Sequence, residues 1–338
     1  MIRSTFLSLL GVLLTLTVSA EESKTTIIKV ATIAPDGTAW TDTLEEAQRE
    51  IREKTQGEVE LKLFTGGSQG DEQQVLDKLR NGTIDAAGLT GAGFGEILSE
   101  VRILEVPLLF RNYEEYDFVR QKLTPYFFKR FKEKGFVLLS WAEGGFAYFM
   151  SQKDISSMDK LRASKVWLRQ GDAFNKLCLD AIDIHPIPLS LSDVILGIQR
   201  GTIETIYVSP LGLIAFQWHP HIKYRVDLPL CNIMAGFVIS DKAFETIPER
   251  HRRTVRQIFW TKTKALVQQV RRDNEIATST LKKQGIITLT VPDKLREEYE
   301  QKGQETAQSL VGEVYPRRLY DVVSKLLAQH RAKQASPE

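Results

Sequence analysis

The chain has 338 residues, with 45 lysines and arginines against 43 aspartates and glutamates and a formal net charge of +2. That length is enough for one large or two medium domains, and a hydrophobic content of 42% excludes a disordered chain. The most basic stretch, residues 250–256, fits one exposed helix face and is not dense enough to follow a nucleic acid. A nucleic-acid partner is therefore not expected.

The N-terminal segment has the composition of an export signal. Arg3 provides a positive start, residues 6–16 are apolar, and Val18-Ser19-Ala20 provides the small residues of a cleavage site. A membrane anchor is the alternative, but an apolar run of about eleven residues is shorter than the roughly twenty that span a bilayer. The sequence therefore predicts cleavage after Ala20 and a mature chain in the periplasm.

Strand and helix patterns alternate after this segment. Residues 27–33, 59–64 and 84–89 are short runs typical of strands, and the segments 40–51 and 75–81 carry apolar residues at helical spacing. This order predicts an α/β fold with a parallel sheet covered by helices. Functional loops are then expected at the carboxyl ends of the strands.

A later segment repeats part of this unit. KLRNGTIDA at 78–86 and GIQRGTIET at 197–205 both end a helix at glycine and enter a strand through a Gly-Thr-Ile-acid step. Coincidence is the alternative, because the transition is common and the match is short. The repeat predicts two α/β lobes.

Further segments are placed to connect these lobes. Two predicted strands, residues 136–141 and 147–150, lead from the first lobe to the second, and one predicted strand, residues 228–239, returns. Three amphipathic helices complete the chain, at residues 249–283, 295–310 and 317–332. A cleft between two lobes is the expected ligand site, and hinged closure is the expected mechanism.

The expected domain boundaries follow from these crossings. The first lobe should contain residues 21–145 and about 233–272. The second should contain residues 146–232 and about 273–338, including the C-terminal helices.

No pattern of catalytic or metal-binding residues stands out. The five histidines lack HExxH spacing and a nucleophile elbow, and His219-Pro220-His221 is more typical of a polar turn. The loop GGSQG at 66–70 lacks the Gly-Lys-Ser/Thr of a phosphate loop. The sequence therefore predicts no enzyme, cofactor or metal site. For Cys178 and Cys231, a disulfide and two buried thiols both remain open.

Seven segments in a fixed order carry a resemblance to a known family. They are GGSQGDE at 66–72, NGTIDA at 81–86, EVPLLFRNYEE at 105–115, GF at 145–146, LRASKVW at 161–167, IPLSLSDVILGIQRGTIET at 187–205 and VISDKAFETIPE at 238–249. From about residue 27 to residue 329, the chain resembles the solute-binding proteins of tripartite ATP-independent periplasmic (TRAP) transporters, the DctP type. The resemblance implies a two-lobed periplasmic binding protein fold, type II-like, with a long connecting helix and no enzymatic activity.

The resemblance also implies partners. The family captures a small organic solute and delivers it to a permease with a small and a large integral membrane subunit, driven by an ion gradient. An accessory periplasmic protein is a further candidate partner. A receptor of an ATP-driven transporter and a ligand sensor need the same two-lobed clamp, so both remain open as alternatives.

The segment KVWLRQGD at 165–172 departs from that family. Its members clamp a carboxylate with an arginine after a Lys-apolar pair, but Trp167 follows the pair here, and Ala147 stands where a second arginine is common. A guanidinium gives a carboxylate two charge-assisted hydrogen bonds that neither replacement can supply. If Trp167 is an apolar anchor, the solute is hydrophobic or mono-acidic rather than a typical dicarboxylate. Arg169, on the same strand face, is the alternative carboxylate partner, and a core role for Trp167 is the third interpretation.

Other candidate ligand-binding residues lie at strand ends and at the first crossing between the lobes. The loop after the first strand starts a helix whose free amides can bind a polar group, or it only caps that helix. The aromatic residues of the crossing, with Trp40, Trp141 and Trp167, line the cleft or belong to two separate cores. Besides Trp167 and Arg169, the candidates are Ala34, Pro35, Thr38, Trp40, Gly67, Thr90, Gly91, Glu143, Phe146, Tyr148, Tyr207, Ser209 and Pro210.

Overall fold

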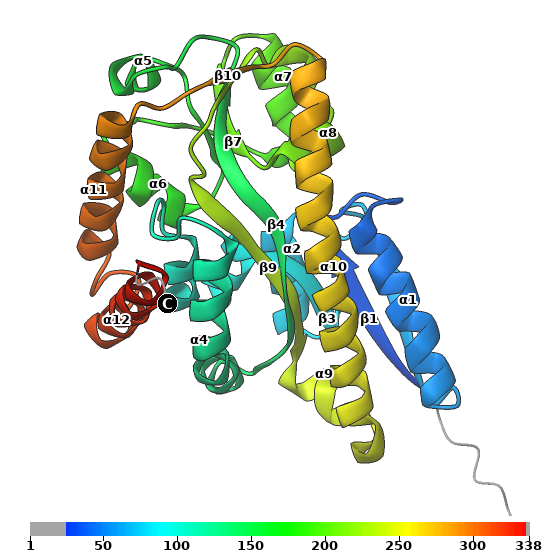
Figure 1. Ribbon diagram of the computed structural model, residues 1–338. Helices are drawn as coiled ribbons and strands as arrows, with labels where there is room; N and C mark the ends of the chain where they lie inside the picture. Colours follow the sequence, from blue (N-terminus) through cyan, green and yellow to red (C-terminus); the bar gives the residue numbers. More distant parts are fainter. Residues whose placement is uncertain (1–24, 336–338) are drawn as a thin grey trace, which may run out of the picture.

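The computed structural model describes residues 25–335, and the first lobe begins with the parallel unit expected from the sequence. Strand β1 (Thr26–Thr32) pairs in parallel with β2 (Val59–Phe64) on one side and with β3 (Ala86–Thr90) on the other. Helices α1 (Ala39–Lys54) and α2 (Glu72–Arg80) make the connections (Figure 1). The predicted signal peptide and its cleavage site lie outside the described residues.

The second lobe repeats this order with shorter strands. Strand β5 (Trp167–Arg169) pairs in parallel with β6 (Ile187–Leu189). Val166, just before β5, forms a parallel bridge to Thr205, the first residue of β7 (Thr205–Val208). In both lobes, therefore, the second and third strands flank the first.

The glycine step of the sequence repeat has the same structural role in both lobes. Gly82 follows α2 with a φ of 78°, and Gly201 follows α7 with a φ of 68°. Only glycine adopts this left-handed conformation without a steric cost, which ends each helix and turns the chain into the next strand.

Two long strands connect the lobes. Strand β4 (Phe136–Ser151) and strand β9 (Cys231–Ser240) run antiparallel to each other, β9 also pairs with β3, and β4 also pairs with β7. The two short strands predicted between residues 136 and 150 are thus one strand, interrupted only by irregularities in its pairing with β9. With β8 and β10 the main sheet has the order β10-β8-β4-β9-β3-β1-β2, and β7 pairs with β4.

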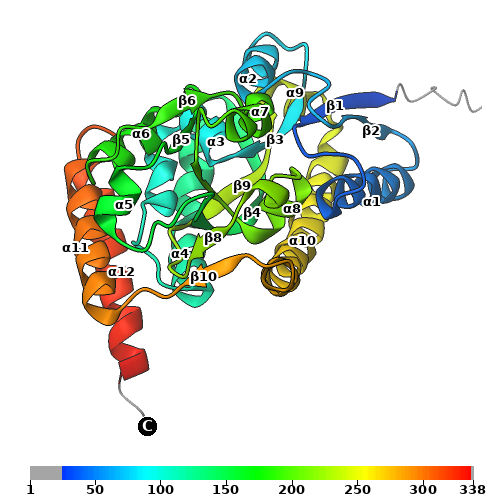
Figure 2. The same ribbon diagram turned by 90° about the horizontal axis from the view of Figure 1, so that it is seen from above.

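The long helix predicted over residues 249–283 is confirmed as α10 (Glu249–Lys283). It runs along both lobes, packing against α1 and β4 and, further along, against α8 (Figure 1). Helices α2 and α7, one from each lobe, lie on the side of the molecule away from α10 (Figure 2). Among residues 25–335, no helix combines the length and hydropathy needed to cross a membrane.

The two C-terminal helices pack on different parts of the molecule. Helix α11 (Asp293–Ser309) contributes Tyr299 to the core of the second lobe. Helix α12 (Arg317–Ala335), which the prediction placed in the second lobe, packs against α4 (Tyr113–Glu133) of the first.

The remaining elements are short and connect the strands. The α-helices are α1 (Ala39–Lys54), α2 (Glu72–Arg80), α3 (Gly91–Ile97), α5 (Met158–Arg162), α6 (Ala173–Asp180), α7 (Val194–Gln199), α8 (Pro210–Ala215) and α9 (Asp241–Thr246). The 3-10 helices are η1 (Ser99–Glu105), η2 (Leu191–Asp193) and η3 (His219–His221), and the last strands are β8 (Tyr224–Val226) and β10 (Ile287–Leu289).

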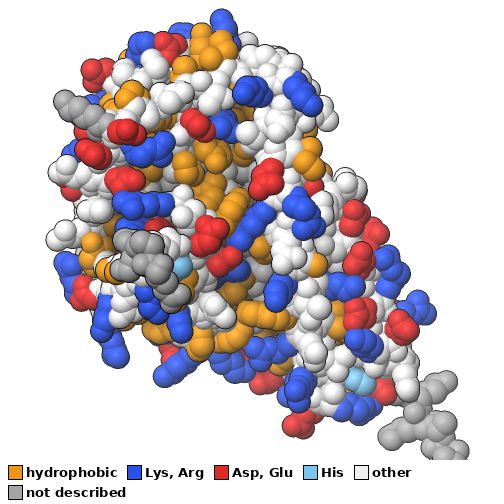
Figure 3. Space-filling model, in the orientation of Figure 1, with side chains coloured by type: hydrophobic (Ala, Val, Ile, Leu, Met, Phe, Trp, Pro, Cys, Tyr) orange, Lys and Arg blue, Asp and Glu red, His pale blue; other side chains and the backbone are white. Residues whose placement is uncertain are grey.

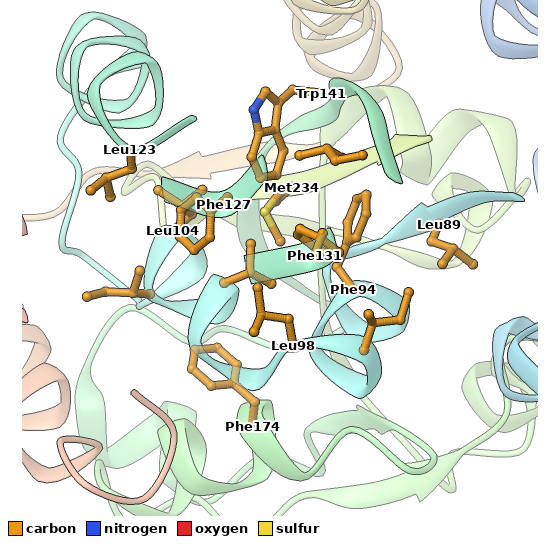
Figure 4. Close-up of a cluster of buried hydrophobic side chains, with 14 of the residues drawn as sticks. Leu89, Phe94, Leu98, Leu104, Leu123, Phe127, Phe131, Trp141, Phe174 and Met234 are labelled. Carbon is orange, nitrogen blue, oxygen red and sulfur yellow. The ribbon is translucent and has the colours of Figure 1, made fainter. Parts of the chain in front are cut away.

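The core of the first lobe extends into the second (Figure 4). Trp141 is 4% exposed, contacts Phe94 and Phe127, and donates a hydrogen bond from Nε1 to Thr124. Trp141 is therefore a core residue, which is the second of the two alternatives given for these aromatic residues. Phe174 of α6 joins the same cluster from the second lobe, so the two lobes are in contact.

Candidate functional site

The carboxyl ends of β3 and β5 meet where the two lobes face each other. Arg169, the last residue of β5, donates a hydrogen bond from Nη1 to Thr90 Oγ1 at 3.1 Å. Its Nη2 lies 3.2 Å from Glu72 Oε2, and the side chains are 18% and 5% exposed. Of the residues predicted from the sequence, the structure brings Thr90 and Arg169 together across the lobes.

Glu72 is the member of this contact that the sequence analysis missed. It is the first residue of α2, placed there by the Asp71 capping box. Its carboxylate accepts hydrogen bonds from Thr90 N at 2.6 Å and Thr90 Oγ1 at 2.8 Å. The signal was available, because Glu72 closes the GGSQGDE segment from which only Gly67 was selected.

A second ion pair joins the lobes nearby. Arg102 of η1 donates to Asp172, the N-cap residue of α6, with Nη1 and Oδ1 3.1 Å apart. Its Nε lies 2.8 Å from Glu105 Oε2, and its guanidinium lies 4.2 Å from the ring centre of Phe174. The side chains of Arg102, Asp172 and Glu105 are at most 8% exposed. We call Glu72, Arg102, Glu105, Arg169 and Asp172 the interlobe charge cluster.

This cluster contains three carboxyl groups and two guanidinium groups. Burial raises the pKa of Glu105 to about 7, because its desolvation outweighs the attraction of Arg102, and the charges of Asp172 and Glu72 add to the rise. Glu105 is also held by Met234, whose backbone N–H donates to Oε1 at 2.8 Å.

The raised pKa of Glu105 predicts a pH-dependent stability. Between pH 4.5 and 7 the folded protein keeps a proton that the unfolded chain releases, so stability falls as pH rises through this window, by about 3 kcal/mol in total. We expect the free energy of unfolding in urea to decrease from pH 5 to pH 8. Glu105→Gln should flatten that decrease relative to the unsubstituted protein. Parallel pH curves for the two proteins would contradict the assignment.

Trp167 lies in the core of the second lobe. Its side chain is 5% exposed, its Nε1 donates to the Leu189 carbonyl at 3.1 Å, and it packs between Tyr207 and Trp218 at centroid distances of 5.5 and 5.7 Å. The Tyr207 hydroxyl is buried without a hydrogen bond among the described residues. Trp167 and Arg169 therefore have different surroundings although they share a strand, and a direct role for Trp167 in ligand binding stays a prediction.

The predicted loop after β1 lies beside the glycine-rich loop of the first lobe. Gly66 N donates to the Ala34 carbonyl at 2.9 Å, and Gly67 N donates to the Thr32 carbonyl at 3.1 Å. Thr38 caps α1 and donates to the Pro35 carbonyl at 2.8 Å. These residues form one edge of the first lobe at the end of β1.

Two helix starts, one from each lobe, also lie close together. Trp40 in the first turn of α1 packs in one cluster with Leu211 of α8. Ser209 caps α8 by accepting a hydrogen bond from Gly212 N at 3.2 Å, and Pro210 occupies the first helical position. Trp40, Ser209 and Pro210 thus lie near the boundary between the lobes.

The candidates from the first crossing have other partners. Glu143 is fully buried and is held by Arg271 of α10, with the closest atoms 2.6 Å apart, and by Asn232 at 3.0 Å. The backbone N–H of Phe146 donates a hydrogen bond to Tyr113 OH at 3.3 Å. The structure does not bring Glu143 or Phe146 to the interlobe charge cluster.

Tyr148 lies further along β4. It pairs with Val208, next to Ser209, and the Arg225 guanidinium lies 4.7 Å from the centre of its ring. Its position beside the end of β7 is compatible with the predicted site, and its role in binding stays a prediction.

The open face of the molecule has an apolar hollow over β4 and β9, between α10 and α11 (Figure 3). A cavity of about 30 Å³ is lined by residues that include Cys178 of α6, Tyr207 of β7, Cys231 of β9 and Tyr299 of α11. Ligand pockets are typically about 300 Å³ or more, so in this conformation the cavity has room only for water. Both cysteines are free thiols here. A wider groove, about 680 Å³, lies over α1 and β2 at the outer edge of the first lobe, away from the charge cluster.

Comparison with known proteins places this geometry in a family. The model described as bacterial extracellular solute-binding protein, family 7 (DctP), matches residues 30–313. A solute-binding protein of Chromohalobacter salexigens is 23% identical over 230 residues, which cover 66% of each chain. The 2,3-diketo-L-gulonate-binding periplasmic protein YiaO of Escherichia coli is 25% identical over 156 residues, 46% of this chain and 47% of that protein. The chain thus spans about half to two thirds of the length of these curated relatives.

Solved structures show the same fold. A TRAP periplasmic solute-binding protein of Ralstonia eutropha with bound (S)-2-acetolactate superposes with a TM-score of 0.83 at 17% identity, covering 90% of this chain and 99% of that chain. DctP7 of Bordetella pertussis, a receptor binding pyroglutamic acid, gives 0.82 at 16% identity with the same coverage. The predicted two-lobed α/β fold is confirmed.

Proposed function

Because the chain belongs to family 7 of the bacterial extracellular solute-binding proteins, the DctP family of TRAP transport, we propose that it captures a small acid with a single carboxylate. The two lobes close on this solute, and the receptor then delivers it to a permease of one small and one large integral membrane subunit. The periplasm is the proposed compartment, after removal of residues 1–20.

The observation that carries the proposal is the reach of Arg169 across the lobe boundary. Arg169 comes from the second lobe, and its partners Thr90 and Glu72 belong to the first. A guanidinium at this place can hold a carboxylate through two charge-assisted hydrogen bonds, and it does so best when the lobes are closed. We assign Arg169 as the carboxylate partner in place of the family arginine that Trp167 replaces.

Of the two guanidinium groups of the interlobe charge cluster, Arg169 is the one that a solute carboxylate can reach by replacing a single ion pair, which favours a solute with one carboxylate. Arg102, the other guanidinium of the cluster, is already engaged by Glu105 and Asp172. A second solute carboxylate would therefore enter next to three protein carboxyl groups without a free partner, at a large desolvation cost. Acetolactate and pyroglutamic acid, bound by the structural neighbours above, also have one carboxylate each, which supports the same solute class.

A ligand screen tests this function. The protein of residues 21–338 should be unfolded and refolded to remove carried-over solute, and then heated with monocarboxylic acids of rising chain length, with dicarboxylates and with the matching uncharged amides. A ligand at one hundred times its dissociation constant should add about 2.7 kcal/mol of stability. Stabilisation by monocarboxylates and not by their amides supports the proposal. Stabilisation by dicarboxylates alone, or by amides as much as acids, contradicts it.

Lobe closure makes a separate prediction. Binding should reduce the radius of gyration, because a solute held between the lobes favours the conformation in which Arg169 approaches the first lobe. Small-angle X-ray scattering of the refolded protein with and without saturating acid measures this change. An unchanged radius at saturation would refute hinge closure even if the acid binds.

The permease partner can be tested independently of the solute. Genes for two integral membrane subunits without an ATPase beside the receptor gene support the TRAP assignment. A neighbouring permease with an ATPase would instead favour a receptor of an ATP-driven transporter.

A further inference from the structure

Glu72 would lose its ion-pair partner when a solute carboxylate binds Arg169. Its side chain is 5% exposed and forms its ion pair with Arg169. If the carboxylate of a solute takes over the Arg169 guanidinium, Glu72 keeps only its hydrogen bonds from Thr90. A buried carboxylate that loses its cation is strongly destabilising, so a solute with nothing but a carboxylate would create this cost on binding.

Glu105 places a second carboxylate beside Glu72. A β-carbon added to Gly91 would lie 1.8 Å from Glu105 Oε2, and one added to Gly93 would lie 3.4 Å from Glu72 Oε2. Both carboxylates therefore lie against the first turn of α3, where glycines leave room for them. Glu105 is 6% exposed, and although Oε2 is near Arg102 Nε, it accepts no hydrogen bond among the described residues.

The net charge of the interlobe charge cluster differs between the free protein and the protein with a bound acid. Above pH 7, where Glu105 is ionised, the three carboxylates and two guanidinium groups leave an excess of one negative charge. A simple monocarboxylate would raise this excess to two, in surroundings from which water is largely excluded. A solute that brings one positive charge with its carboxylate leaves the excess at one and supplies a new partner for Glu72.

We infer that the solute is a zwitterion of the amino-acid class, with its carboxylate on Arg169 and its ammonium group on Glu72, on the side where Glu105 lies. An ammonium group has three N–H donors, which suits the Glu72 carboxylate once it has lost its ion pair with Arg169 and keeps only the hydrogen bonds from Thr90. This inference rests on the proposed function and narrows its solute class.

Matched solutes test the inference without any substitution. Titration calorimetry should compare an amino acid with its hydroxy-acid and deaminated counterparts, for example phenylalanine, 3-phenyllactate and 3-phenylpropionate, together with alanine, lactate and propionate. The amino acid of at least one series should bind on the order of tenfold to a hundredfold more tightly than its counterparts, the range expected for a charge-assisted contact.

A variant of Glu72 assigns the preference to this residue. Glu72→Gln keeps an oxygen to accept from Thr90 but loses the charge, so it should remove most of the preference for the amino acid. The deaminated acid should bind more tightly, because a charged Glu72 no longer competes with its carboxylate for Arg169. Asp77→Asn is the matched control, because Asp77 lies on the same helix with a side chain that is 64% exposed. Urea unfolding of both variants shows whether they are folded, and if Glu72→Gln is not, the comparison of solutes on the natural protein decides.

The outcomes separate the two proposals. If hydroxy acids or deaminated acids bind as tightly as amino acids, and Arg169→Ala abolishes their binding, the proposed function as a receptor for acids is supported. The zwitterion inference is overturned. If acid binding instead requires uptake of a proton and weakens steadily toward pH 8, protonation supplies the missing charge and the inference is also overturned. If no carboxylate of any kind binds, the proposed function fails together with the inference.

Discussion

Arg169→Ala should weaken binding of the carboxylate solute by roughly 2–5 kcal/mol, a loss of about thirtyfold to several thousandfold. The reason is that the substitution removes the guanidinium at the end of β5 that reaches Thr90 and Glu72 across the lobe boundary. Titration calorimetry with the acid selected by the ligand screen measures the effect. Arg169→Lys should give an intermediate loss, because an ammonium keeps the charge without the two-pronged geometry.

A control separates this effect from a general change in charge. Arg200→Ala removes one arginine from an exposed position in the same lobe and should leave the affinity unchanged. If Arg169→Ala binds as tightly as the natural protein, the carboxylate lies elsewhere, and the interpretation of Trp167 as the anchor becomes the stronger one.

Trp167→Ala should lower the free energy of unfolding by about 3–5 kcal/mol, the usual cost of truncating a buried aromatic side chain. Trp167 is 5% exposed and fills the space between Tyr207 and Trp218 in the second-lobe core. Urea unfolding at constant pH measures the change. Trp260→Ala is the control, because Trp260 is 42% exposed and its loss should cost much less.

This result also decides between two roles of Trp167. A ligand anchor could be truncated with loss of affinity and little loss of stability, which is the outcome expected if KVWLRQGD marks an apolar binding surface. Loss of stability shows instead that the tryptophan supports the strand from which Arg169 extends. Normal stability combined with lost affinity would contradict the core role that the structure gives to Trp167.

The fold could be predicted well where local patterns decide it. The parallel strands of the first lobe and the long helix at residues 249–283 follow from periodicity and from glycine at helix ends. The first crossing was predicted as two strands, residues 136–141 and 147–150, with Gly144-Gly145 between them. In the structure Gly145 has a φ of 85° and lies against Asn274, so the strand continues through an irregularity in its pairing.

The irregular pairing of β4 also affects Glu143, a predicted site residue that pairs with Arg271 in the structure. Strict alternation assigns side chains to faces only while the register is regular, and the pairing of β4 with β9 shifts between Leu138 and Ser140 and again between Glu143 and Gly145. The face of Glu143 could therefore not be read from its position in the sequence. Its partner Arg271 is 128 residues away, on a helix with many similar charged residues.

The interlobe charge cluster could not be predicted from local sequence patterns, because its members are far apart in the chain. Arg102 and Asp172 are 70 residues apart, and Arg169 and Thr90 are 79 residues apart. Nothing in the surroundings of Arg102 distinguishes it from an exposed arginine until the lobes are placed together. Thr90 was predicted because it follows the third strand, and strand ends of this fold meet at one edge. Arg169 was predicted because it shares a strand face with Trp167, which stands at the place of the family arginine.

A crystal structure with the best acid from the screen tests the central claim most directly. We predict that the solute lies between the lobes, with its carboxylate within hydrogen-bonding distance of the Arg169 guanidinium and the Arg169–Glu72 contact replaced. A solute whose carboxylate contacts another cation, or one that occupies the cavity beside Tyr207 and Tyr299 while Arg169 stays paired with Glu72, would contradict it.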